Sequence, residues 1–370
     1  MYCEDFGGVI GVGGSLPHTS RTSAIRLIAI DMDGTLLGDD GHVSPRNLAA
    51  IRAAEAAGIE VVVATGRRHS YAMRVLRPLG LGAANALISS NGTVTRTLGA
   101  FGPEPVASQP IARTHLPHAT ALWLCGHIGE FRNALVLTFD RVGPGGDDER
   151  GALVVEHLDE LNASIGRWMA ANEPYIAHVV PIENALGDSP DNVDSPIQAM
   201  LCGTVERMAR AEALLLQHPG VAASGHPSGR TGKTMNGAVS TAPGAPLVTA
   251  SPARLGLEAK GSKPILTLHR TEYPDRDLSI LDILPAGCSK GAALLSLASL
   301  RGIVADQILA IGDNWNDVSM LEVAGTAVLM DNAPAGLKEL ARTRNWRVGR
   351  SNRDDGVAEA IEAACGVTVP

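Results

Sequence analysis

A short apolar run that ends in two carboxylates, residues 27–36 (LIAIDMDGTL), constrains this chain most. Four or five apolar residues bounded by polar turn residues are typical of a strand buried on both faces of a parallel sheet, although a run this short also fits a buried helix. The glycine that follows, Gly34, favours the strand. In open parallel sheets ligands bind beyond the carboxyl ends of the strands, so we expect Asp31 and Asp33 to emerge in a ligand-binding crevice.

Asp31 and Asp33 are two carboxylates two residues apart at the end of an apolar segment. Each would raise the pKa of the other unless a cation lay between them. Mg²⁺ takes oxygen ligands, commonly carboxylates together with waters and substrate phosphate oxygens. With Mg²⁺ bound, one aspartate can act as an ionised nucleophile while the other transfers a proton. The alternative is an ordinary polar turn, because turns are rich in Asp and Gly.

Four further motifs follow the first one in order along the chain. They are residues 61–67 (VVVATGR), 88–92 (ISSNG), 287–291 (GCSKG) and 311–317 (IGDNWND). Together with DMDGTLL this ordered set resembles the haloacid dehalogenase superfamily of phosphohydrolases, specifically its Cof-like members with an α/β cap. Each motif is weak alone, but five in this order are specific.

The resemblance implies an α/β fold with a Rossmann-like parallel-sheet core of three α/β/α layers and an inserted α/β cap. We expect the catalytic core over residues 24–92 and 287–370, and the cap over residues 93–286. The resemblance also implies a phosphoric monoester hydrolase in which Asp31 attacks phosphorus and becomes an aspartyl-phosphate. Asp33 would then act as acid and base, and its main-chain carbonyl would bind Mg²⁺.

Two motifs suit the phosphate group of a substrate. Thr65, Gly66 and Arg67 follow a predicted strand, and the Thr65 hydroxyl with nearby amides can hold a phosphate oxygen; the alternative is an ordinary helix N-cap. Asn91 and Gly92 read equally well as a simple turn. The resemblance implies that the chain leaves the core for the cap here and that Asn91 contacts substrate.

Lys290 lies in the first turn of a helix predicted over residues 289–300. The free amides of a helix N-terminus and a lysine beside them suit a phosphate dianion. Only five of the 31 basic residues are lysines. A lysine here can also neutralise the paired aspartates, and the alternative is a solvated surface side chain.

Asp313 and Asp317 are four residues apart after a strand predicted over residues 307–311, so a loop that turns into a helix can direct both at one metal ion. We expect Asp313 to bind Mg²⁺ directly and Asp317 to bind it through water or to brace the site. Asn316 would donate to phosphate. The alternative is a strand-to-helix turn with two capping groups.

Composition limits the class of protein. A chain of 370 residues suits two domains, and a net charge of −8 shows no basic footprint for nucleic acid. The five cysteines are scattered and lack metal-binding spacing, which favours a reducing compartment. No apolar run approaches the length of a membrane span. We expect a cytoplasmic monomer or homodimer whose partner is a small phosphorylated metabolite, with no nucleic acid and no membrane.

Three segments show no clear helix or strand pattern. Residues 1–23 are expected to be a flexible leader, or alternatively a transit segment for a plastid or mitochondrion, which would change the compartment. Residues 219–264, dominated by Gly, Pro, Ser, Ala and Thr, are expected to be a disordered insertion in the cap. Residues 143–151 are also expected to lack regular structure.

The rest of the predicted cap mixes strands with helices. We expect strands over residues 134–139, 175–182, 197–202, 265–269 and 278–284, and helices over residues 159–172 and 204–217.

Three functions stay open. The first is a Mg²⁺-dependent phosphatase that acts on a sugar phosphate or on a phosphorylated vitamin or flavin precursor. The second is a phosphotransferase or sugar-phosphate mutase on the same core, and the third is a non-catalytic metabolite-binding regulator. The intact Asp31, Asp33, Lys290 and Asp313 argue against the third. Dehalogenation is disfavoured, because relatives that cleave carbon–halogen bonds typically lack an aspartate at the position of Asp33.

Overall fold

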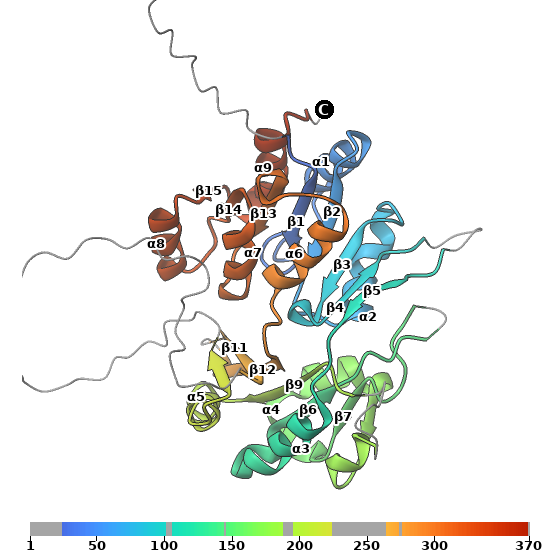
Figure 1. Ribbon diagram of the computed structural model, residues 1–370, viewed down its shortest axis with the longest axis vertical. Coiled ribbons are helices and arrows are strands. Elements are labelled where there is room, and N and C mark those ends of the chain that lie inside the picture. The colour runs from blue at the N-terminus through green and yellow to red at the C-terminus, as the bar shows by residue number, and fades with distance from the viewer. Residues whose placement is uncertain are drawn as a thin grey trace, which may run out of the picture.

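The computed structural model describes residues 24–100, 106–143, 146–187, 195–223, 264–273 and 276–368. These parts of the chain form two bodies, each built on one β-sheet (Figure 1). The first sheet has eight strands and the second has seven. The predicted α/β architecture is confirmed, whereas the predicted leader, residues 1–23, lies outside the described residues.

Strand β1 (Leu27–Asp31) is at the centre of the first sheet, and all five of its residues are buried. It pairs in parallel with β13 (Ile308–Gly312) on one side and β2 (Glu60–Ala64) on the other. Its side chains alternate between two apolar clusters: Ile28 and Ile30 belong to one, and Leu27 and Ala29 to the other. A continuous apolar run is therefore what this position requires.

The first sheet has the strand order β15-β14-β13-β1-β2-β3-β4-β5. Its remaining strands are β3 (Ala86–Ser89), β4 (Val94–Thr97), β5 (Pro110–Arg113), β14 (Thr326–Leu329) and β15 (Arg347–Val348). The pairs from β15 to β3 are parallel, whereas β4 and β5 are antiparallel additions. The carboxyl ends of the parallel strands consequently share one edge of the sheet.

Helices cover both faces of the first sheet. The cluster that contains Ile28 and Ile30 also holds side chains of α1 (Pro45–Ala56), α2 (His69–Leu76) and α9 (Gly356–Cys365). The opposite cluster holds side chains of α6 (Lys290–Leu300), α7 (Val318–Val323) and α8 (Ala335–Arg344). The implied three-layer α/β/α core is therefore present.

Serine side chains cap the first turns of two helices that cover the first sheet. The Ser44 hydroxyl accepts a hydrogen bond from the Asn47 amide at 3.1 Å before α1, and the Ser289 hydroxyl accepts one from the Ala292 amide at 3.1 Å before α6. Such bonds satisfy amides that lack a partner within the helix. The cap at Ser289 also sets Lys290 as the first residue of α6.

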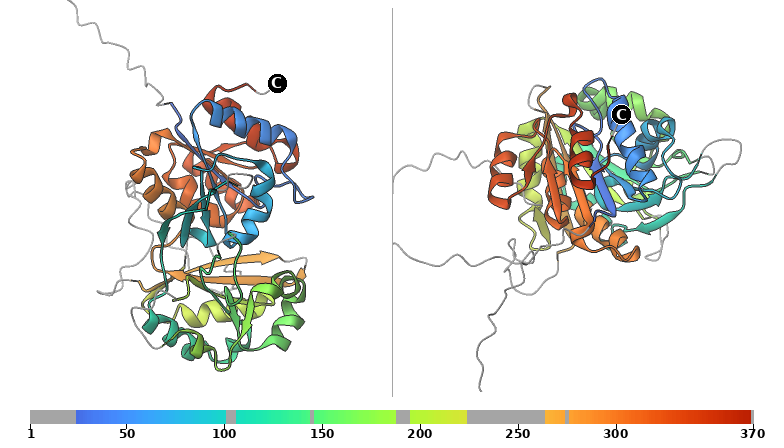
Figure 2. Two further views of the ribbon diagram at one scale, coloured as in Figure 1. Left: turned by 90° about the vertical axis from the view of Figure 1, so that its right-hand side faces the viewer. Right: turned by 90° about the horizontal axis from the view of Figure 1, so that it is seen from above.

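The second sheet has the strand order β10-β11-β12-β9-β6-β7-β8. Its strands are β6 (Leu135–Thr138), β7 (Leu153–Val155), β8 (Ile176–His178), β9 (Gln198–Gly203), β10 (Val221–Ala223), β11 (Leu266–Tyr273) and β12 (Leu278–Pro285). Helices α3 (His118–His127) and α5 (Val205–Leu215) share an apolar cluster with one face. Helix α4 (Leu158–Asn172) packs on the other face over β6 to β9. In Figure 2 the long strands β11 and β12 lie on the side that faces the first body.

The structure differs from the predicted boundaries in two places. Strands β4 and β5 keep the chain in the first sheet as far as Arg113, so we propose Arg113 rather than Gly92 as the end of the first core segment. Strand β10 lies within the predicted insertion, where Val221 is buried and pairs with Leu266. Residues 224–263 of that insertion lie outside the described residues.

The predicted cap elements are mostly observed, with shifted ends. Strand β8 ends at His178, whereas the prediction extends to residue 182, and β11 continues to Tyr273 beyond the predicted residue 269. Helix α3 and strand β7 were not expected. Residues 146–151 form neither helix nor strand, although Asp148 is buried. Among the described residues no helix is long and apolar enough to cross a membrane.

Candidate active site

The predicted site residues follow the carboxyl ends of neighbouring parallel strands. Strand β1 ends at Asp31, β2 leads to Thr65, β3 leads to Asn91 and β13 leads to Asp313. These strands are aligned in register, since Asp31 pairs with Ala64 and Ile30 with Ile311. Segments far apart in the sequence therefore meet at one edge of the sheet, where ligands bind in open parallel sheets.

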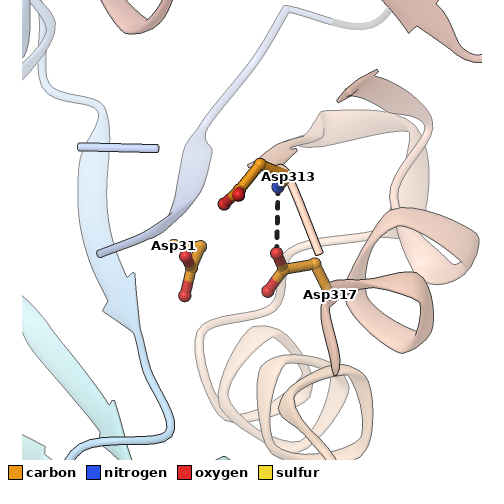
Figure 3. A group of neighbouring side chains, drawn as sticks. All are labelled: Asp31, Asp313 and Asp317. Carbon is orange, nitrogen blue, oxygen red and sulfur yellow. Dashed lines mark hydrogen bonds between the residues drawn. The ribbon is translucent and has the colours of Figure 1, made fainter. Parts of the chain in front are cut away.

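Three carboxylates form the centre of this edge. Asp31, Asp313 and Asp317 are buried, and one oxygen from each lies within 4.8 Å of the others (Figure 3). Burial, followed by repulsion from Asp317, raises the pKa of Asp31 well above its ordinary value and that of Asp313 to about 7. We refer to these three residues as the carboxylate cluster.

Lys290 is a fully buried cation within the carboxylate cluster. Its Nζ donates to Oδ1 of Asp31 at 2.5 Å and to Oδ1 of Asp317 at 2.6 Å. Burial alone would lower the pKa of Lys290, but the attraction of Asp31 and Asp317 outweighs burial and raises that pKa above its ordinary value. Lys290 therefore stays protonated, and it is not the solvated surface residue of the alternative interpretation.

Asp317 is held by hydrogen bonds from its own loop. Its Oδ2 accepts from the amides of Asp313 at 3.0 Å and Asn314 at 2.9 Å, while Oδ1 accepts from Lys290. The first of these bonds is the dashed line of Figure 3. With a fully buried side chain and three donors, Asp317 fits a bracing function better than direct metal ligation.

The carboxylate cluster fits a divalent cation. Three carboxylates face one lysine, which leaves two negative charges without a counter-charge in a buried site. Mg²⁺ takes oxygen ligands and is commonly bound by one or two carboxylates. Gly34, at φ +78°, leaves room beside Asp313, since a Cβ at residue 34 would lie 2.4 Å from Oδ2 of Asp313.

Asp33 lies apart from the carboxylate cluster. Its side chain is 55% exposed and forms a two-point ion pair with Arg67, whose Nε donates to Oδ2 of Asp33 at 2.7 Å. The Arg67 guanidinium also lies 4.8 Å from the ring centre of Tyr71. Any metal contact from Asp33 would therefore come from its main-chain carbonyl, as the family resemblance implies.

The predicted phosphate-binding residues lie together beside the cluster. The hydroxyl oxygen of the buried Thr65 accepts a hydrogen bond from the Arg67 amide at 3.1 Å. The alternative interpretation of Thr65 as a helix cap is wrong, because α2 begins only at His69. Asn316 donates from Nδ2 to Oδ1 of Asn91 at 3.4 Å. Gly66 packs against the same Asn91 amide, since a Cβ at residue 66 would lie 3.1 Å from that Oδ1.

Two further residues hold the cluster in place. The Thr35 hydroxyl donates to Oδ1 of Asp313 at 2.7 Å. Asn332 donates from Nδ2 to the Gly34 carbonyl at 2.8 Å and to Oδ2 of Asp313 at 3.3 Å. The sequence analysis did not predict either function. Thr35 belongs to the first motif. Asn332 follows β14, so it could have been found from the rule that the ends of parallel strands meet at one edge.

Ion pairs, buried except for the side chain of Arg113, join the two bodies next to the site. Arg68, which directly follows Arg67, pairs with Asp148. Arg96 and Arg113 both pair with Asp140, and each of these two contacts is 2.6 Å long. The arginines come from the first body and the aspartates from the second. We call these five residues the arginine junction.

Known proteins share both the sequence pattern and the fold. The family described as haloacid dehalogenase-like hydrolase matches residues 28–123 and 267–361, which is more than half of the chain. Among solved structures, a haloacid dehalogenase-like hydrolase from Bacillus subtilis has a TM-score of 0.62 at 22% identity, over 91% of this chain and 99% of that one. At this identity the likeness shows the fold.

Curated relatives include two phosphatases. The 5-amino-6-(5-phospho-D-ribitylamino)uracil phosphatase YwtE of Bacillus subtilis is 27% identical, over 91% of this chain and 97% of that protein. The pyridoxal phosphate phosphatase YbhA of Escherichia coli is 26% identical, also over 91% and 97%. The chloroplastic endoribonuclease YBEY of Arabidopsis thaliana is 25% identical over 90% of this chain, but the chain spans only 45% of that protein.

Proposed function

Because the chain belongs to the haloacid dehalogenase-like hydrolase family, we propose that it is a Mg²⁺-dependent phosphatase that hydrolyses a small phosphorylated metabolite through an aspartyl-phosphate. One observation carries this proposal. Asp31 lies at the end of the central strand, ion-paired with the buried Lys290 and next to Asp313. A carboxylate in this setting can act as a nucleophile toward phosphorus.

The phosphoryl group of the substrate binds at the edge of the sheet. Lys290 and the amides at the start of α6 attract its negative charge, since a helix N-terminus favours anions. The Thr65 hydroxyl, the Gly66 amide and the Asn316 side chain donate to its oxygens, and Arg67 and Asn91 border the same place.

The first chemical step transfers the phosphoryl group to the enzyme. An oxygen of Asp31 forms a bond to phosphorus in line with the ester bond, which breaks. Asp33 donates its proton to the departing alcohol oxygen. Arg67 holds the Asp33 side chain in place through their two-point contact.

The second step frees the phosphate. Asp33, now anionic, takes a proton from a water molecule, and that water attacks phosphorus. The bond between phosphorus and Asp31 breaks, which restores the Asp31 carboxylate beside Lys290 and leaves Asp33 protonated for the next cycle. The same group therefore acts as acid and then as base.

Mg²⁺, when bound, neutralises negative charge on the phosphoryl oxygens and on the carboxylates around them. The side chains of Asp31 and Asp313 and the main-chain carbonyl of Asp33 would hold the ion. Asp317 would brace the loop that carries Asp313 through the two amide hydrogen bonds described above.

The relatives that this chain covers almost completely support the proposed substrate class. They are named for a phosphorylated ribitylaminouracil and for pyridoxal phosphate, so we include phosphorylated flavin precursors and vitamins, together with sugar phosphates, in the proposed class. The endoribonuclease name belongs to a protein more than twice as long as the matched part. We propose a cytoplasmic location, with the plastid as the alternative because that relative is named as chloroplastic.

A phosphate-release screen tests the proposal. Purified protein is incubated with a panel of phosphorylated metabolites in MgCl₂, in excess EDTA, and in EDTA followed by excess MgCl₂. We expect release in the first and third conditions and none in the second. Full activity in excess EDTA would contradict the metal assignment, and transfer of phosphate between two sugars without net release would favour a mutase.

A further inference from the structure

A half-buried carboxylate of the second body, Asp282, contacts the site through Asn91. Asp282 lies on β12, and its Oδ2 accepts from Nδ2 of Asn91 at 3.1 Å. Its Oδ1 accepts from Nε2 of Gln198 at 3.4 Å, on the neighbouring strand β9. Burial raises the pKa of Asp282 to about 7, opposed by the hydrogen bond from Asn91. Asp282 is 191 residues from Asn91 in the sequence and is not used in the proposed mechanism.

Asn91 is fixed against the start of α6. Its backbone is left-handed, with φ +53°, and Gly92 follows with φ +97°. A Cβ at residue 92 would lie 2.2 Å from the Ser289 carbonyl oxygen, so the chain packs closely on the helix that begins with Lys290. The backbone of Asn91 therefore has little freedom. Its side-chain amide can still adopt two orientations, which differ in whether the oxygen or the nitrogen faces a given neighbour.

Both ends of the Asn91 amide are occupied. Nδ2 donates to Asp282, and Oδ1 accepts from Asn316. An amide can exchange its oxygen and nitrogen by rotation, so its orientation depends on the partners that it meets. A carboxylate accepts hydrogen bonds, so Asp282 selects the orientation in which the Asn91 oxygen faces Asn316.

We propose that Asp282 is a positioning residue of the active site: through Asn91 it orients the Asn316 amide toward the phosphoryl group. The inference rests on the proposed function, in which Asn316 donates to phosphate. It adds that the second body contributes to phosphate binding through a strand residue that does not touch the phosphate. Reversal of the Asn91 amide would turn its nitrogen toward the Asn316 nitrogen and remove that contact.

Three variants separate this function from general damage. Asp282→Leu removes the acceptor at similar volume. Asp282→Asn retains one acceptor oxygen and can restore the bond from Asn91. Ser279→Ala is the matched control, because Ser279 is buried on the same strand and donates at 3.1 Å to the Thr271 carbonyl within the second sheet. If leucine prevents folding, Asp282→Ser replaces it, since the shorter side chain cannot span the contact.

The readouts are the inhibition constant of inorganic phosphate and the KM and kcat for 4-nitrophenyl phosphate in MgCl₂. We expect Asp282→Leu to raise the inhibition constant and KM about tenfold, the effect of losing one hydrogen bond to a charged group, and to change kcat less. Asp282→Asn should recover most of the loss, and Ser279→Ala should match the wild type. An unchanged inhibition constant in Asp282→Leu, or an equal rise in Ser279→Ala, overturns the proposal.

Phosphate binding measured by calorimetry in MgCl₂ separates this inference from the proposed function. Wild-type protein that binds inorganic phosphate but hydrolyses no ester contradicts the proposed function alone. Equal phosphate affinity in the wild type and Asp282→Leu contradicts the positioning function alone. Wild-type protein that binds no phosphate contradicts both.

Discussion

The carboxylate cluster and the arginine junction are two groups of mostly buried charges, and their charge balance differs. In the junction each aspartate has at least one arginine partner. In the cluster three carboxylates share one lysine. Burial lowers the pKa of Arg68 only to about 10, so Arg68 stays charged at neutral pH, whereas the pKa values of Asp31 and Asp313 are raised.

This difference indicates different functions for the two groups of charges. One stabilises the fold, and the other is suited to bind a ligand. Removing charges from water is costly, and a group that contains its own counter-charges needs no ligand to offset that cost. In the junction three arginines meet two aspartates, and the third arginine, Arg113, is 27% exposed to water, so the buried aspartates need no ligand. We expect the junction to hold the two bodies together. The cluster lacks two counter-charges, which a divalent cation would supply, and we expect it to act in catalysis.

The largest expected effect is on turnover, and it differs between Asp31 and Asp33, the two aspartates of the first motif. Asp31→Asn should abolish turnover, because an amide cannot serve as the attacking carboxylate. Asp33→Asn keeps the main-chain carbonyl but removes the proton donor and acceptor, which is typically worth about 10²–10⁴-fold in rate. Rapid-quench labelling with an activated aryl phosphate should trap phosphoenzyme in the Asp33 variant and none in the Asp31 variant. Phosphoenzyme in the Asp31 variant would place the nucleophile elsewhere.

The next effect concerns the junction and is one of stability. Arg68→Ala leaves Asp148 buried without its partner, so we expect the free energy of unfolding to fall by about 3–5 kcal/mol. Arg342→Ala is the control, because the Arg342 pair with Glu339 is exposed on α8 and should matter by less than about 1 kcal/mol. Denaturant unfolding measures both.

A second variant sharpens the same comparison. Arg68→Met combined with Asp148→Leu removes both charges of the pair and should recover much of the lost stability. An Arg68→Ala protein with unchanged stability but no phosphatase activity would show that the junction belongs to the site, and the distinction between the two charge groups would fail.

The smallest expected effect is a pH dependence of stability at Asp282. Its pKa of about 7 in the folded protein lies above its ordinary value of 3.8, so between these values the folded state binds more protons than the unfolded state. The free energy of unfolding should therefore fall as pH rises from 4 to 7 and stay level above, by no more than about 4 kcal/mol. Asp282→Asn removes the titrating group and with it this pH dependence. The free energy of unfolding of the variant minus that of the wild type should therefore be larger at pH 8 than at pH 4. An equal difference at both pH values would contradict the assignment.

Local sequence patterns were sufficient for the centre of the first sheet. The apolar run before Asp31 predicts a buried strand. This prediction succeeds because helices cover both faces of β1, so every side chain of the strand is buried. The helix predicted over residues 289–300 is observed as α6, and the hydrogen bond of its capping residue, Ser289, spans only three residues. The motifs after β2, β3 and β13 could be placed together because parallel strands present their carboxyl ends at one edge.

Contacts between distant segments could not be predicted in this way. The pairing of Asp33 with Arg67 and that of Asp282 with Asn91 depend on where loops and two separate sheets meet. Strand β10 has three residues, too few to show a period, and it forms only because β11 lies beside it.

The sequence by itself determined the order of the motifs, the central strand and the residues that follow the strand ends, because each depends on spacing over a few residues. Only the tertiary structure decided which charges meet: Lys290, expected beside Asp31 and Asp33, pairs with Asp31 and Asp317. Arg68 and Asp148 are 80 residues apart, and Lys290 and Asp31 are 259 apart. The charge balance of a buried group is a sum over neighbours in space, and those neighbours are known only once the strands and helices have packed.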